Sequence, residues 1–196
     1  MQLVPTNEFL AWAGHHGIGR SPQYPQSDSL WFSGEGATWY RYRPSTPTGH
    51  SAADLDAAVT VAGAGGPIWC FPPNHDGTWV GATADLLPWE PPVLAAMRAG
   101  GIRPGYIGAI GLRKDEIGLA AHLLAAALDG NAQWPFAIIP EHARCLLLAD
   151  EDGNFVGAFP DAGALAGFTH ALAAAGWKEP TEPDSRVSLT DPWLES

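Results

Sequence analysis

The sequence predicts an α+β fold in which antiparallel β-hairpins are each followed by a helix. The main observation is an internal repeat: residues 76–100 align without a gap with residues 152–176 and share nine identical positions. Self-similarity of this kind indicates a repeated supersecondary unit. Each copy begins with Asp-Gly, a strong hairpin signal, and ends with a glycine that suits a helix end.

The later copy gives the pattern in full. An apolar run over 144–150 predicts a first strand, Asp152-Gly153 predicts the turn, and alternation over 154–159 predicts the returning strand. The segment 164–176 predicts a helix that stops at Gly176. Its apolar side chains share one helical stripe, which consists of Leu165, Phe168 and Leu172.

The earlier copy predicts the same order of elements. Residues 67–71 form the first strand, a turn follows at Asp76-Gly77, and residues 78–83 return. Pro91 and Pro92 suit the first turn of a helix that ends at Gly100-Gly101.

A third, more diverged copy precedes these two. Strands are expected over 29–33 and 37–43, with a helix over 52–63 that Ser51 caps. The remaining elements expected from local pattern are a helix at 7–13, a strand at 106–112, a helix at 114–128 and a strand at 135–139.

The domain organisation expected is a single compact domain over 1–196. It consists of two related halves, about 1–101 and 102–178, and a Pro-rich acidic tail over 179–196. The tail is expected to lie against the body through three apolar residues, Val187, Leu189 and Trp193.

The charge balance restricts the partners. The net charge is -11, so the chain repels phosphate backbones and anionic membrane surfaces. No Lys or Arg occurs between Arg43 and Arg98, or between Arg144 and Lys178. An acidic face built from these windows attracts a basic protein, although the same charges also serve solubility alone.

The cysteines and the first residues bear on the compartment. Cys70 and Cys145 occupy nearly the same place in the two aligned copies and are expected to be buried small side chains rather than a disulfide or reactive thiols. The first residues show no basic segment followed by a long apolar run, so no signal peptide is predicted. We therefore expect a cytoplasmic protein.

No motif indicates catalysis, a metal or a cofactor. His75-Asp76 follows Cys70, but the turn already explains the Asp, and a strand directs the cysteine elsewhere. His15-His16 lacks further ligands at short spacing. The glycine-rich segment 14–21 lacks the ending of a P-loop. These observations favour a non-enzymatic protein with no cofactor and no metal.

The function expected is protein binding, in its most concrete form a bacterial immunity protein or inhibitor that neutralises a toxin through an acidic surface with aromatic anchors. One alternative is a structural or assembly subunit of a phage or secretion apparatus. Another is a small-molecule-binding protein or enzyme with a site between the two halves, using His75, Trp79, Tyr40 or Arg41.

The residues expected to contact a protein partner lie on the hairpin edges and following loops of the first two units. They are Glu35, Trp39, Tyr40, His75, Asp76, Trp79, Asp85, Trp89 and Glu90. Trp89-Glu90 is the most distinctive pair, because the later copy has Leu165-Ala166 at the same place. The alternative for this pair is a core tryptophan followed by an acidic helix N-terminus.

Overall fold

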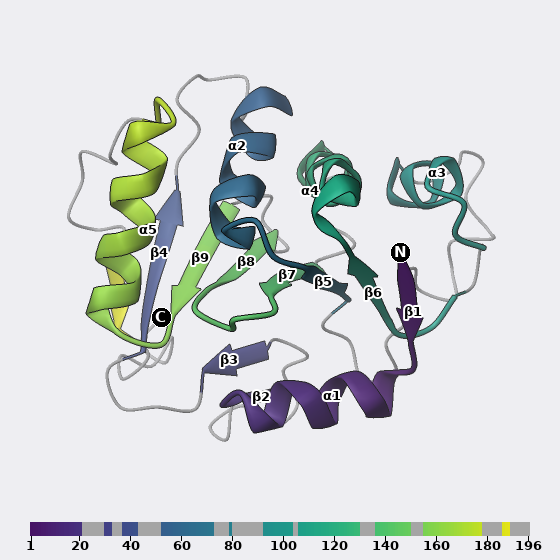
Figure 1. Cartoon of the computed structure of the whole chain (residues 1–196), viewed down its shortest axis with the longest axis horizontal. Helices are drawn as coiled ribbons and strands as arrows, with labels where there is room; N and C mark the ends of the chain where they lie inside the picture. Colours follow the sequence, from purple (N-terminus) through teal and green to yellow (C-terminus); the bar gives the residue numbers. More distant parts are fainter. Residues whose placement is uncertain are drawn as a thin grey trace, which may run out of the picture.

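An eight-stranded antiparallel sheet forms the centre of the computed structural model (Figure 1). The structure describes residues 1–20, 30–32, 37–42, 52–72, 79, 92–103, 106–129, 136–149, 155–177 and 186–188. In spatial order the strands are β1 (Gln2–Val4), β6 (Ala109–Leu112), β5 (Ile68–Phe71), β7 (Phe136–Pro140), β8 (Leu146–Ala149), β9 (Phe155–Phe159), β4 (Thr38–Tyr42) and β10 (Arg186–Ser188).

Helices cover both faces of this sheet (Figure 1). One face carries α2 (Ala52–Gly63), α3 (Pro92–Ala99), α4 (Gly118–Asp129) and α5 (Ala162–Ala174). The opposite face carries α1 (Thr6–His15) and a small second sheet of β2 (Ile18–Arg20) and β3 (Leu30–Phe32). The predicted α+β class is confirmed.

The central strands bury both of their faces. In β5, Ile68 and Cys70 join the core under α2 and α4, while Phe71 joins the core under α1. In β8, Leu147 belongs to the first core and Leu146 to the second. Successive side chains of a strand point to opposite faces, so a strand covered on both sides is apolar throughout. This requirement explains the unbroken apolar runs in the sequence.

The later repeat copy forms the hairpin and helix that its sequence predicts. β8 and β9 pair antiparallel, with Leu147 opposite Gly157 and Leu148 opposite Val156. α5 follows at once, and Asp161 caps it by accepting a 2.7 Å hydrogen bond from the Ala164 N–H. Asp161 is one of the positions shared by the two copies, and its role here is that of an N-cap.

The ββα repeat is not confirmed for the earlier copies. Both edges of β5 are occupied over Ile68–Cys70, on one side by β6 and on the other by β7, so β5 is not half of a local hairpin. β3 pairs with β2, whereas β4 pairs with β9 and β10, so these two strands do not form the predicted hairpin either. Local turn signals therefore do not determine which strands pair.

Two other expectations were close to the structure. The segment predicted as one helix over 114–128 is divided into a 3₁₀ turn, η2 (Lys114–Glu116), and the helix α4. The tail contributes β10, which pairs antiparallel with β4 and places Val187 opposite Trp39. Strands from the two proposed halves are intermixed in the sheet, and the division into related halves stays a prediction.

Candidate functional site

One predicted contact residue, Trp79, has a described side chain, and it is buried. Trp79 is 3% exposed, and its indole N–H donates a 2.9 Å hydrogen bond to the carbonyl of Gly108. Trp39 and Tyr40 lie on β4, where their backbones pair with β9 and β10. The other residues expected at the contact surface, Glu35, His75, Asp76, Asp85, Trp89 and Glu90, lie outside the described residues.

The exposed hydrophobic residues lie on a different surface, at the end of the sheet that β1 forms. In the described part of the chain, the large hydrophobic residues that are exposed are Met1 (39%), Leu3 (46%) and Ile107 (51%). Met1 and Leu3 lie at or on β1, and Ile107 lies just before β6, the neighbour of β1. We call β1 with these three side chains the β1 edge. Exposed apolar side chains that gather at one place are typical of interaction sites.

The β1 edge is fixed to the sheet by a small set of contacts. Tyr106 donates its hydroxyl toward the carbonyl oxygens of Val4 (3.0 Å) and Ala109 (2.9 Å). Gly108 has a φ of +125°, and a β-carbon there would overlap with the Val4 carbonyl oxygen. Trp79 holds the carbonyl of the same glycine. The buried tryptophan thus supports the edge without being part of its surface.

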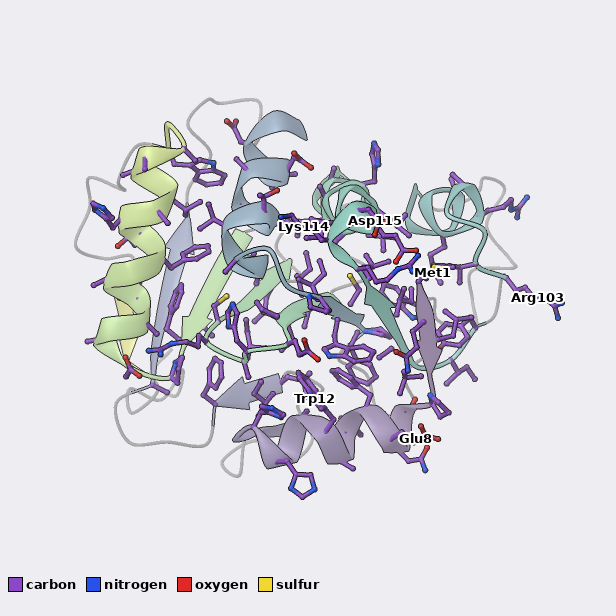
Figure 2. All side chains as sticks on the ribbon, viewed as in Figure 1. Met1, Glu8, Trp12, Arg103, Lys114 and Asp115 are labelled. Atoms are coloured by element: carbon purple, nitrogen blue, oxygen red, sulfur yellow. The ribbon has the colours of Figure 1, made fainter. Side chains whose placement is uncertain are left out.

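A pocket of about 340 Å³ lies beside the β1 edge. Residues from the start of the chain, the end of α3, β6, η2 and the start of α4 form its lining, namely Met1, Gly100, Leu112, Asp115, Glu116, Gly118 and Leu119. We call it the β1 pocket. Two leucines give it an apolar surface, and two carboxylates stand among its lining residues. In Figure 2 Met1 and Asp115 lie near one another, whereas Arg103 extends away at the periphery.

The glycines of this pocket have different roles. A β-carbon on Gly100 would come within 2.7 Å of a terminal methyl of Leu119, so a larger residue there would require the Leu119 side chain to move. A β-carbon on Gly118 would meet no atom within 4 Å. Gly118 therefore leaves open space at the start of α4, on the pocket wall.

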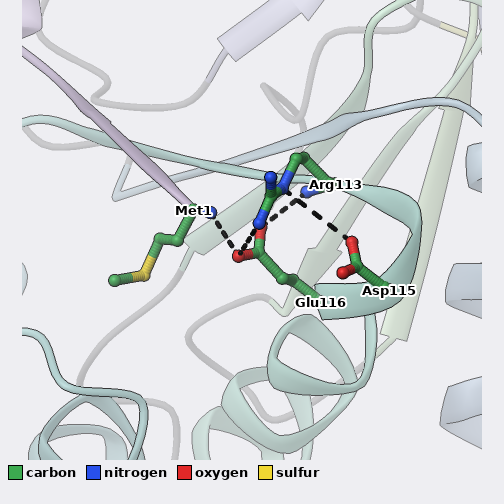
Figure 3. Close-up of polar contacts among 4 residues, drawn as sticks. All are labelled: Met1, Arg113, Asp115 and Glu116. Carbon is green, nitrogen blue, oxygen red and sulfur yellow. Dashed lines mark hydrogen bonds and ion pairs between the residues drawn. The ribbon is translucent and has the colours of Figure 1, made fainter.

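Glu116 is the most heavily bonded polar group of the pocket (Figure 3). It accepts hydrogen bonds from the Arg113 backbone N–H (3.0 Å), from the Arg113 guanidinium (3.2 Å) and from the amino group of Met1. The backbone bond, the amino group and the guanidinium together lower the pKa of Glu116 to about 2. Asp115, in contrast, is 77% exposed, and its nearest cation is Arg113 Nε at 3.9 Å.

Because of Glu116, the stability of the fold is predicted to decrease at low pH. Its pKa in the folded chain lies below the ordinary value of about 4.3, so its stabilising contribution is present above that value and is lost as pH falls toward 2. Replacing Glu116 by Gln should therefore lower the urea midpoint at pH 7 and make little difference near pH 2. A difference between the two proteins that stays constant over this range would contradict the assignment.

The two cysteines are core residues, as the sequence predicts. Cys70 and Cys145 are free and buried. Burial raises the pKa of the Cys70 thiol and raises that of Cys145 to about 12, which disfavours the reactive thiolate. We expect neither thiol to react with Ellman's reagent in the native chain at pH 8, and both to react in 6 M guanidinium. Rapid labelling of the native chain would contradict this.

Several histidines serve the fold. His142 Nε2 lies 2.9 Å from the carbonyl oxygen of Ala62, and its Nδ1 accepts a 3.1 Å bond from the Arg144 N–H. The His16 ring lies tilted against that of Trp12, with centroids 4.6 Å apart, and its Nδ1 lies 2.8 Å from the Trp12 carbonyl oxygen. Within the described ranges, no three His, Cys, Asp or Glu side chains are placed to hold a metal ion together.

An aromatic cluster joins α1 to the sheet near the β1 edge. The ring of Trp12 lies 5.7 Å from that of Trp69, which in turn covers Gly111, where a β-carbon would come within 2.6 Å of the ring. Phe9 stacks on Phe71 at 4.5 Å. These contacts hold α1, and with it the residues that follow β1, against the sheet.

Comparison with known proteins assigns no family. No family model matches the chain, and searches of curated proteins and of solved structures found no match. Among the described helices, none is long and apolar enough to span a bilayer.

Proposed function

We propose that this protein is a protein-binding module that engages its partner through the β1 edge. The observation that carries the proposal is that Met1, Leu3 and Ile107 are exposed along one edge of the sheet, where Met1 also lines the β1 pocket. An edge strand offers unpaired backbone groups to a second chain, and neighbouring pockets select its side chains. Apolar contacts supply the affinity that a short strand alone lacks.

The finer form of the proposal is that the partner is a basic toxin, which this protein neutralises. Its support is the net charge of -11, which accelerates association with a basic protein at low salt. The other residues predicted from the sequence stay proposed as contacts, and they would form a second surface, because Trp39 and Tyr40 lie on β4, far from β1 in the sheet. They are Glu35, Trp39, Tyr40, His75, Asp76, Asp85, Trp89 and Glu90. Trp79 is omitted from this set because its indole belongs to the core.

Site-specific photo-crosslinking tests the proposal. The photoreactive residue p-benzoylphenylalanine is placed at Leu3 in the full-length chain and, as a control, at Ala166 on the exposed side of α5. We expect a discrete crosslinked protein from position 3 in the cells that make this chain, and none from position 166. The yield should fall as salt is raised from 50 to 500 mM, since the charge attraction is screened. Equal products from both positions, or none from either, would contradict the proposal.

A further inference from the structure

We propose that the segment bound at the β1 edge carries a lysine or arginine, whose aliphatic stem enters the β1 pocket and whose charge pairs with Asp115. This inference rests on the proposed function, because it names the chemistry of the partner at the same surface. The occupant is an extended basic segment of a different protein.

The backbone of β1 is oriented to accept such a segment. The Val4 carbonyl lies against Gly108 and Tyr106, so Val4 directs its polar backbone groups toward β6. Backbone groups of successive residues alternate in direction along a strand, which leaves the N–H and C=O of Leu3 pointing away from β6. On that side of β1 the described residues contribute no further strand. Leu3 is therefore the position at which an added strand would hydrogen-bond.

The pocket lies on the face that an added strand would share with Leu3. Leu3 pairs with Ile110, which belongs to the core beneath the helices, and cross-strand partners lie on the same face. The pairing of Gln2 with Gly111 places Met1 level with Leu112, on the pocket lining. A side chain that enters from an added strand thus passes the exposed apolar atoms of Met1 before it reaches Leu112 and Leu119.

The two carboxylates of the pocket differ in how many cations already contact them. Glu116 already accepts bonds from Met1 and Arg113, so its charge is compensated. Asp115 has a single long contact, at 3.9 Å from Arg113 Nε, and is exposed. The Lys114 ammonium lies near Gly65, beyond the end of α2, where a β-carbon would be 3.6 Å from it. Among the carboxylates lining the pocket, Asp115 is thus the one with capacity for a further partner.

Lysine and arginine match this combination of apolar lining and exposed carboxylate. Their methylene stems cover apolar surface while the charged group stays near water. A glutamate would be repelled by Asp115, and a leucine would leave the carboxylate unused. A second copy of the chain is disfavoured as the occupant, because each copy carries a net charge of -11.

The test uses the full-length chain labelled with ¹⁵N and three blocked peptides of sequence Ser-Val-Thr-X-Thr-Val-Ser. The central residue X is lysine, norleucine or glutamate. Norleucine keeps the length of the lysine stem without its charge. We expect the lysine peptide to shift the amide resonances of Leu3 and Asp115, and to bind about two- to fivefold more tightly than the norleucine peptide, the ratio typical of one exposed ion pair. The glutamate peptide should bind most weakly.

Two variants distinguish the contribution of the Asp115 charge from binding at the β1 edge. Asp115→Asn should bring the lysine and norleucine peptides to equal affinity, while Asp56→Asn, an exposed acid on α2, should leave the ratio unchanged. Equal binding of the two peptides to the unmodified chain would overturn the basic anchor and leave binding at the β1 edge standing. Absence of any shift at Leu3 would overturn the anchor as well. The crosslink from position 3 tests the proposed function independently of both peptide results.

Discussion

Replacing Gly108 by alanine is expected to lower the free energy of unfolding by about 2–4 kcal/mol. Gly108 adopts a φ of +125°, which L side chains rarely adopt, and a β-carbon there would overlap with the Val4 carbonyl oxygen. The same glycine accepts the Trp79 hydrogen bond at 2.9 Å. Alanine therefore has two effects: it strains the backbone, and its β-carbon forces β1 away from β6. Urea denaturation followed by circular dichroism measures the loss.

Gly167 provides the matched control for this substitution. It lies in the interior of α5 and is exposed, and a β-carbon there would meet no atom within 4 Å. Alanine at this position should raise the free energy of unfolding by about 0.5–1 kcal/mol, since glycine is the poorer helix former. If Gly108→Ala were as stable as the unmodified chain, the described attachment of β1 would be wrong.

Replacing Leu3 by lysine is expected to weaken binding of the crosslinked partner by about 30-fold or more, the effect of losing an interface residue worth about 2 kcal/mol. Leu3 is 46% exposed on the face of β1 that it shares with the pocket. The substitution removes the branched apolar end of the leucine side chain and places a positive charge opposite a basic segment. Calorimetric titration with the purified partner measures the affinity.

Gln2→Lys is the control for charge and position. Gln2 is exposed, lies on the same strand and pairs with Gly111, so its side chain projects to the opposite face from Leu3. It should reduce the affinity only a few-fold, through the change in net charge. Both variants should retain the thermal midpoint of the unmodified chain. Equal losses from the two variants would indicate that charge alone, and not the β1 edge, determines binding.

Local sequence signals predicted the helices well and the strand pairing poorly. A helix depends on neighbours within a few residues, so the Ala-rich segments of α2 and α5 could be predicted directly. β5 instead pairs with β6 and β7, whose residues lie some forty to seventy positions further along the chain. No turn signal encodes such long-range partners. The Asp-Gly sequence signal at Asp152 predicted a correct strand pair, because β8 and β9 are adjacent in sequence.

The candidate site could be predicted only in part. Aromatic residues near turns were expected at the surface, yet Trp79 is buried, and the carbonyl of Gly108 accepts a hydrogen bond from its indole N–H. The β1 edge was missed because exposure of Leu3 follows from the order of the sheet, which places β1 last. The available signal was a short apolar alternation that ends at Pro5, and it resembles that of any short strand.

Hydrogen–deuterium exchange of the complex with the crosslinked partner tests the central claim most directly. If the partner binds the β1 edge, amide exchange should slow over residues 1–4 and 112–119, the two segments that supply β1 and most of the pocket, and should stay unchanged in the exposed part of α5. Protection confined to α5 or to α2, with residues 1–4 exchanging as in the free chain, would contradict it.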